Sequence, residues 1–148
     1  MSIESKKVVI SLKETWHKMD HLYDTYAKSV GLNFTTILVL ELLHDSQEPL
    51  TQKDICEILS LPKQVINLII KWLWEEGYVR LQEAQDRRIK QIILTGSGRE
   101  YIERTIGPLK VAEEKAWESF SDEEMSALSS TMERFIGVLE SLLSPSQK

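Results

Sequence analysis

The spacing of apolar residues predicts a chain built mainly of helices. Between residues 8 and 30 the apolar positions recur at alternating steps of three and four, the spacing of helices that pair along a narrow seam. The positions of this first seam are Val9, Leu12, Trp16, Met19, Tyr23, Tyr26 and Val30. A second seam near the end of the chain comprises Met125, Leu128, Met132, Phe135, Leu139 and Leu142. We therefore expect helix-pairing surfaces at both ends of the chain.

Capping signals divide the next part of the chain into two helices. Gly31 is expected to end the first helix, and Asn33 to cap a largely apolar second helix that stops before Pro49. Thr51 and Asp54 then form a capping box, in which each side chain accepts a hydrogen bond from the other residue's backbone amide. We therefore expect a short third helix to begin there. Its expected buried stripe is Ile55, Ile58 and Leu59.

A tight turn and a change of period follow the third helix. Pro62 suits the first position of a fourth helix, which we expect over residues 63–76. Beyond it the apolar residues recur with a period of two, which predicts strands at 78–82 and 90–94 joined by a short polar tip. A helix, a turn, a second helix and a hairpin in this order make a winged helix-turn-helix, here over residues 49–95.

The last third of the chain predicts two more helices. Thr95 can cap the first of them, which the Gly-Pro pair at 107–108 should kink or interrupt. A second capping box at 121–124 opens the last helix, and the tail at 144–148 is expected to fray. We therefore predict a mainly α fold with a small β-hairpin wing, in one domain that spans residues 1–148.

The fourth helix has an outward face suited to DNA. The major groove of B-DNA admits one helix, and the helix before it braces that helix against the backbone. Steps of about 100° per residue place Gln64 and Asn67 on this face, where their amides suit base edges. Lys63 and Lys71 lie beside them and suit phosphates. The sequence therefore predicts contacts with double-stranded DNA from these four residues.

The distribution of charge agrees with this placement better than the net charge does. The chain has a formal net charge of −5, which by itself argues against a nucleic-acid partner. Residues 49–95 hold seven basic and six acidic residues, a balance of +1, so the rest of the chain carries −6. The acidity therefore lies outside the predicted winged helix-turn-helix, although the asymmetry is mild.

Length and composition exclude several classes of protein. A chain of 148 residues that is 42% hydrophobic and 28% charged is globular and can bury a core without disulfides or metals. Its longest aliphatic run, residues 37–40, is far shorter than the roughly 20 residues of a membrane span. The N-terminus lacks the apolar stretch of a signal peptide, and one cysteine cannot form an internal disulfide. We therefore expect a cytoplasmic protein without membrane contact.

The wing carries the most specific motif in the chain. The run Asp86-x-Arg88-x-x-x-Ile92-x-Leu94-Thr95-x-x-Gly98 fits, at every fixed place, the pattern D-x-R-x-x-x-[aliphatic]-x-L-T-x-x-G of the multiple-antibiotic-resistance regulator (MarR) family. Three further segments are similar to that family: Thr51-Gln52 with Ile55 and Leu59, Gly77-Tyr78-Val79, and Phe120-Ser121-x-x-Glu124 with Leu128. The chain thus resembles this family of winged-helix transcription factors over approximately residues 8–143.

The resemblance implies roles for the charged residues of the wing. Arg88 would enter the minor groove, with Asp86 orienting it, because a guanidinium stays charged and bonds two acceptors at once. Arg87 and Lys90 would meet phosphates. Taken alone, such a charged run is common at a solvated hairpin tip, but the Leu-Thr-x-x-Gly register that follows it favours DNA contact.

The fourth helix departs from the family pattern in two places. Where this chain has Leu68, the family usually has a polar or basic residue, and it often has another at the position of Trp72. Apolar groups there could touch thymine methyls or pack within the protein, and they lose phosphate contacts. They leave open an alternative function, a protein-interaction module with the same fold and weak or lost DNA binding.

A single module of this kind reads only half of a two-fold site, so we expect a homodimer. The expected dimerisation helices are 8–30 and 100–143, which flank the winged helix-turn-helix core; pairing within one chain is the alternative, and the resemblance favours pairing between subunits. The resemblance further implies a sequence-specific regulator, a repressor released by a small aromatic or anionic effector. The residues that could line an effector pocket are Trp16, His17, Tyr23 and Tyr26, although the sequence favours a dimer core for them.

Other chemistry finds little support in the sequence. His17 and His21 share a helix face, but two exposed histidines are more typical of solvated side chains than of a metal site. Cys56 has no cation beside it in the sequence to form a thiolate, which favours a structural role. The chain has no phosphate-binding glycine loop and no nucleophile elbow. We therefore expect no catalytic residue, no cofactor and no metal.

Overall fold

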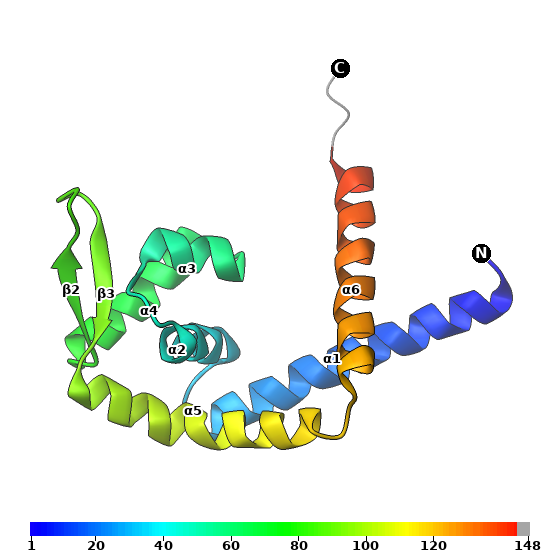
Figure 1. The fold of residues 1–148 in the computed structure, drawn as a ribbon, viewed down its shortest axis with the longest axis horizontal. Coiled ribbons are helices and arrows are strands. Elements are labelled where there is room, and N and C mark those ends of the chain that lie inside the picture. The colour runs from blue at the N-terminus through cyan, green and yellow to red at the C-terminus, as the bar shows by residue number, and fades with distance from the viewer. Residues whose placement is uncertain (145–148) are drawn as a thin grey trace. The chain divides into compact units, whose positions relative to one another are not determined.

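The computed structural model describes residues 1–144 of the chain. In chain order these residues form α1 (Ile3–Ser29), α2 (Phe34–Asp45), β1 (Leu50–Thr51), α3 (Gln52–Leu59), α4 (Lys63–Glu75), β2 (Val79–Glu83), β3 (Lys90–Leu94), α5 (Gly96–Trp117) and α6 (Asp122–Leu143) (Figure 1). The predicted mainly α fold with a small β-hairpin wing is confirmed. The expectation for the tail falls outside the described residues except at Ser144, the C-cap of α6.

The chain divides into two compact units. The first ends at Pro108 and contains the helix-turn-helix with its hairpin, and the second begins at Leu109. The division falls within α5, which runs without a break through Gly107 and Pro108, so the predicted interruption is absent. Proline removes a single N–H donor, and the hydrogen bonds of the neighbouring residues carry the helix past it.

The core of the first unit is built by apolar residues of α2, α3, α4 and α5. Its largest fully buried side chains are Ile37, Val39, Leu40, Ile55, Ile66, Ile70, Leu73, Ile102 and Ile106. Burial of each such side chain stabilises the fold by roughly 1.5–3 kcal/mol. Because α4 buries one full face in this core, its opposite face is left to solvent.

The buried stripe of α3 differs from the predicted one. Ile55 is fully buried and Leu59 is half-buried, but the Ile58 side chain is 56% exposed, so its prediction as a core residue is wrong. Successive residues of a helix point about 100° apart, and the stripe that passes through Ile55 and Leu59 therefore misses Ile58. In so short a helix the apolar pattern alone leaves this choice undecided.

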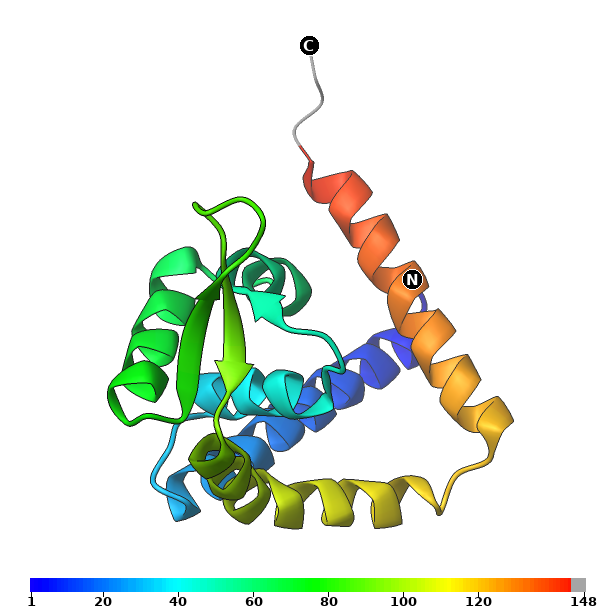
Figure 2. The same ribbon diagram turned by 60° about the vertical axis from the view of Figure 1, so that its left-hand side comes forward.

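The sheet has three strands in the order β1-β3-β2 (Figure 2). The hairpin of β2 and β3 is antiparallel, with register running from Val79 opposite Leu94 to Glu83 opposite Lys90. β3 has its predicted bounds, and β2 lies one residue later than predicted. The sequence did not predict β1, whose two residues are too few to show a period; Leu50 pairs with Ile92 and thereby ties the start of α3 to the wing.

The helix ends follow the capping signals, with two corrections. Thr51 and Asp54 form the predicted capping box, and these hydrogen bonds lower the pKa of Asp54. α1 begins at Ile3 and not at residue 8, because the Ser2 hydroxyl caps it by accepting a hydrogen bond from the Ser5 amide at 3.1 Å. Pro62 is the N-cap of α4 and not its first helical residue.

The helices α1 and α6, which carry the two predicted pairing seams, leave apolar side chains exposed both on the seams and beside them. On α1 these include Ile3, Val8, Val9, Ile10, Leu12, Met19 and Leu22. On α6, where no described residue is buried, they include Leu128, Phe135, Ile136, Val138, Leu139 and Leu142. Within residues 1–144 no single helix is long and apolar enough to cross a membrane, and α1 and α2 pass such a test only as a pair bent by 83°.

Candidate nucleic-acid interface

The outward face of α4 carries the polar residues that its periodicity predicts. Lys63, Gln64, Asn67 and Lys71 are all exposed, whereas the opposite face is buried in the core. The Lys71 ammonium lies 3.8 Å from the carboxylate of Glu75 one turn later, and both side chains are largely exposed. A surface pair of this kind contributes less than about 1 kcal/mol, so it leaves Lys71 available to a phosphate.

Trp72 belongs to an aromatic cluster and not to the open face of α4. It is half-buried and meets the rings of Tyr78 and Tyr101 edge-on, at centroid distances of 6.1 and 6.0 Å. The two tyrosine rings stack on each other 4.2 Å apart, and burial raises the pKa of Tyr101. This cluster joins α4 to the start of the hairpin and to α5, so it fixes how α4 stands beside the wing.

Two other apolar side chains of α4 remain exposed. The Leu68 side chain is 68% exposed and that of Trp74 is 55% exposed. Of the two departures from the family pattern, therefore, only Leu68 lies on the open face. Leu68 can contact a partner's apolar groups there, such as thymine methyls in a major groove.

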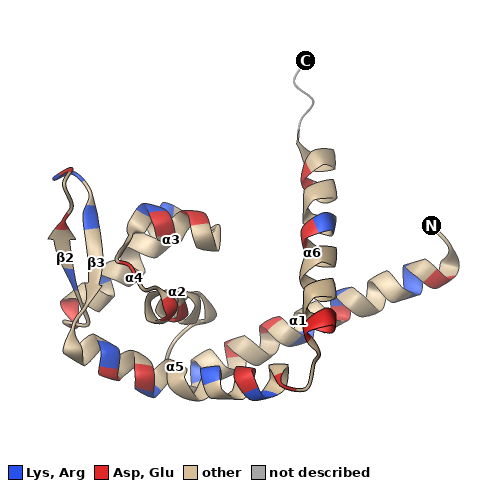
Figure 3. Cartoon of the chain, in the orientation of Figure 1, with Lys and Arg blue, Asp and Glu red and all other residues tan. Residues whose placement is uncertain are grey.

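The tip of the hairpin is a tight turn that presents Arg88 to solvent. The backbone oxygen of Asp86 accepts a hydrogen bond from the Ile89 amide at 2.9 Å, and the Ala84 amide donates to the Ile89 oxygen at 3.0 Å. The Arg88 side chain is 90% exposed, and Arg87 and Lys90 are exposed as well. Figure 3 shows basic positions at the tip and on β3. The wing is thus a finger that projects cationic side chains.

Asp86 holds Arg88 through three hydrogen bonds. Arg88 donates from its backbone amide to Oδ1 at 3.0 Å, from Nε to Oδ1 at 3.2 Å and from Nη2 to Oδ2 at 3.3 Å. These hydrogen bonds lower the pKa of Asp86, and those from the Arg88 side chain have a larger effect than the one from its backbone amide. The carboxylate therefore stays ionised at neutral pH. The two side-chain hydrogen bonds orient the guanidinium, and its remaining N–H groups can donate to a second acceptor.

Three of the eight predicted DNA-contacting residues line one hollow. They are Lys63 from the start of α4 and Arg88 and Lys90 from the wing. The residues that do not line it are Gln64, Asn67, Lys71, Asp86 and Arg87. Gln52 and Lys53, at the start of α3, also line the hollow, and sequence reasoning missed both. Their position directly after the residue that caps α3 is the signal that could have found them.

The residues considered for other chemistry do not line the hollow. His17 and His21 are exposed on α1. Within residues 1–144 no group of three or more His, Cys, Asp or Glu side chains could hold a metal ion. Cys56 is a half-buried free thiol in α3.

Sequence comparison places the helix-turn-helix in a known family. Residues 30–89 match the family model described as the MarR family. The chain is 33% identical over 89 residues to the uncharacterized HTH-type transcriptional regulator YwoH of Bacillus subtilis. That match covers 60% of this chain, and the chain spans 64% of the length of this relative.

Solved structures extend the likeness to nearly the whole chain. NMB1585, a MarR family regulator from Neisseria meningitidis, is similar with a TM-score of 0.79 and 27% identity, over 92% of this chain and 96% of that one. MepR of Staphylococcus aureus in its complex with DNA has the same fold, with a TM-score of 0.66 and 21% identity over 88% of this chain and 96% of that one. Motif, family match and full-length fold agree: residues 30–89 match the MarR family, and the chain has the winged helix-turn-helix fold of MarR family structures.

Proposed function

We propose that this protein is a sequence-specific, double-stranded DNA-binding transcriptional regulator that acts in the cytoplasm as a homodimer. One observation carries the proposal: an exposed polar face of α4 stands beside a hairpin whose tip presents an arginine that is 90% exposed and held by a carboxylate. The MepR structure is described as a complex with DNA, which supports the same use of this fold here.

In this proposal α4 enters the major groove and the wing reaches the adjacent minor groove. Gln64 and Asn67 read base edges, because their amides present a donor and an acceptor side by side. Arg88 enters the minor groove, where the negative potential attracts a guanidinium. The residues that neutralise phosphates are Lys63, Lys71, Arg87 and Lys90.

The homodimer is supported by the exposed apolar seams of α1 and α6. On α1 the seam residues Val9, Leu12 and Met19 are 37%, 42% and 53% exposed. Soluble proteins rarely leave such a contiguous row open, and a second copy of the chain would cover it. Two-fold pairing would hold the two α4 helices about one DNA turn, ~34 Å, apart.

Selection of bound duplexes from a random library tests this function. We expect enriched sequences with two inverted half-sites whose centres lie about 10 base pairs apart, because the dimer places its two α4 helices one turn apart. Enrichment of single, unpaired half-sites would contradict the dimer. A library that shows no enrichment at all would contradict sequence-specific binding.

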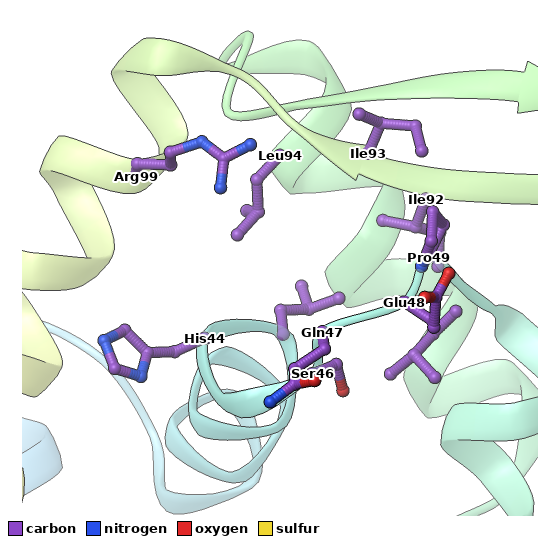
Figure 4. Close-up of a pocket in the computed structure, with 11 residues that line it drawn as sticks. His44, Ser46, Gln47, Glu48, Pro49, Ile92, Ile93, Leu94 and Arg99 are labelled. Atoms are coloured by element: carbon purple, nitrogen blue, oxygen red, sulfur yellow. The ribbon is translucent and has the colours of Figure 1, made fainter.

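We further propose that the regulator is a repressor released by a small anionic effector. A cavity of about 130 Å³ lies among α2, β3 and α5 (Figure 4). Arg99 points from α5 into the space between β3 and α2, beside the apolar side chain of Leu94. His44 stands on the α2 side, where its Nε2 lies 3.5 Å from the Glu103 carboxylate of α5. A cationic side chain beside an apolar surface suits an aromatic acid, because the cation can pair with the carboxylate and the apolar surface can contact the ring.

Two of the four residues named from the sequence for an effector pocket, Tyr23 and Tyr26, have other contacts. The Tyr26 hydroxyl donates to the Thr105 backbone oxygen at 2.7 Å, and the Tyr23 ring packs against Phe34 at a centroid distance of 5.4 Å. Both tyrosines thus hold α1 against its neighbours in the first unit. The cavity beside Arg99 is for this reason the better effector site.

Replacing Arg99 with alanine should separate release from DNA binding. With benzoate as the probe, we expect the variant to bind duplex within about twofold of the wild type but to need roughly tenfold more benzoate for release, since a charged hydrogen bond is lost. Arg104→Ala is the matched control, because Arg104 lies on the same helix but does not line this cavity. Equal release of all three proteins would contradict the site, and no release of the wild type would contradict this class of effector.

An interaction module without DNA binding is the second candidate function. Exposed Leu68 and Trp74 on α4 favour it, since exposed apolar side chains of a helix can dock on another protein. Trp72, which the sequence offered as a second reason, is packed within the chain. The two functions differ in one observable, the affinity for duplex DNA at low salt.

A further inference from the structure

A hollow of about 540 Å³ gathers cations from three separate parts of the sequence. It lies among the start of α3, the start of α4 and the wing. Its lining residues are Thr51, Gln52, Lys53, Asp54, Lys63, Arg88, Ile89 and Lys90. Four of these are basic and one is acidic, so the hollow favours an anion.

The only carboxylate among these lining residues, that of Asp54, caps α3. Asp54 Oδ2 accepts hydrogen bonds from the amide and the hydroxyl of Thr51, each at 2.8 Å. Lys53 approaches Glu57 at 3.8 Å in a pair whose side chains are 83% and 65% exposed, which is too weak to hold it. Within residues 1–144 neither Lys63 nor Lys90 forms an ion pair with Asp54. The basic side chains that line the hollow can therefore bind a ligand.

The position of the hollow identifies that ligand. Adjacent major and minor grooves of a duplex are separated by one sugar-phosphate strand. If α4 lies in one groove and the wing in the next, the space between them must hold that strand. Resting on the proposed function, we propose that this hollow binds a phosphate of the strand between the grooves and that Lys53 is a further DNA-binding residue.

The start of α3 adds to the attraction. α3 begins at Gln52, so its first-turn amides belong to the residues that line the hollow. Helix N-termini carry a partial positive charge that stabilises a nearby phosphate. One strand would thereby contact α3, α4 and the wing together, which fixes the depth at which the wing sits. Lys53 contributes affinity without reading sequence.

Lys53→Gln tests the inference in the full-length protein. We expect its affinity for duplex to fall about five- to tenfold near 0.1 M salt, equally for selected and random duplexes. With two hollows per dimer, the slope of log affinity against log salt should become less steep by about 1.8. Lys28→Gln is the matched control, because Lys28 also pairs across one helical turn, with Asp24 at 2.6 Å, but lies in α1. This control should bind like the wild type.

Further variants and measurements distinguish the possible outcomes of this test. Lys53→Arg should retain the salt slope, and unchanged thermal melting of each variant should show that the exposed substitution leaves the fold intact. Wild-type affinity and slope in Lys53→Gln would overturn the inference while leaving DNA binding in place, and a loss confined to the selected duplex would also overturn it. Wild type that binds no duplex would overturn both proposals. Stronger competition by inorganic phosphate than by chloride at matched ionic strength, abolished in Lys53→Gln, would support the inference, because it would show that duplex and free phosphate bind at the same lysine.

Discussion

Replacing Gly98 with alanine is expected to lower the free energy of unfolding by about 3 kcal/mol. A Cβ at this position would lie 1.9 Å from the Tyr78 backbone oxygen and 2.8 Å from the carbonyl carbon of the same residue. Backbone atoms cannot swing aside as a flexible side chain can. The variant must therefore separate the start of α5 from the start of the hairpin.

The neighbouring hydrogen bonds prevent this contact from relaxing. The Tyr78 oxygen accepts from the Thr95 amide at 3.0 Å and from the Thr95 hydroxyl at 3.1 Å, and that hydroxyl also donates to the Gly77 oxygen at 2.7 Å. The Gly98 amide in turn donates to the Thr95 hydroxyl oxygen at 3.0 Å, which caps α5 as the sequence predicts. Moving α5 outward would break several of these bonds, and each contributes about 1 kcal/mol.

Urea unfolding followed by circular dichroism measures the effect, with Gly96→Ala as the matched control. A Cβ at Gly96, in the first turn of the same helix, meets nothing within 4 Å. Alanine is the better helix former, so this control should be as stable as the wild type or slightly more stable. Equal stability of the two variants would contradict the close packing at Gly98.

Replacing Arg88 with alanine is expected to weaken duplex binding about 100-fold, from roughly tenfold for each of the two wings of a dimer. The alanine variant loses the guanidinium that we place in the minor groove, together with its charge-assisted hydrogen bonds. Asp86 already orients that guanidinium in the free protein, so little conformational entropy is lost on binding. The same variant should melt at the wild-type temperature, because the side chain is 90% exposed.

Fluorescence anisotropy with labelled duplex measures this loss, and Arg87→Ala is the control for charge alone. Arg87 is the exposed neighbour of Arg88 at the same tip, and its proposed phosphate contact predicts a loss of only about three- to fivefold per dimer. Equal losses for the two variants would mean that the wing contributes charge without entering the groove. An Arg88→Ala affinity within twofold of the wild type would contradict the role of the wing.

Local signals in the sequence predicted the two capping boxes and the hairpin correctly. Thr51 with Asp54 and Ser121 with Glu124 form the capping boxes, since each requires only residues three apart in one turn. The period of two after Gly77 likewise marks the wing. Each of these features depends on neighbours in the chain, which is why a sequence pattern can carry it.

The sequence alone did not decide the features that depend on contacts between distant parts of the chain. β1 exists because Leu50 pairs with Ile92, and no period can appear in two residues. The sequence left open whether Trp72 faces DNA or packs within the protein, and its contacts with Tyr78 and Tyr101 place it in an aromatic cluster. Lys53 joins the candidate interface only because the fold brings the start of α3 beside the wing. Tertiary contacts decided all three.

Titration of the wild-type protein into labelled duplex, at two or more salt concentrations, tests the DNA-binding function most directly. The proposed phosphate contacts predict tight binding at low salt and a loss of roughly 10³–10⁵-fold in affinity between about 50 and 200 mM salt. No binding at the lowest salt, or an affinity that does not change with salt, would contradict it.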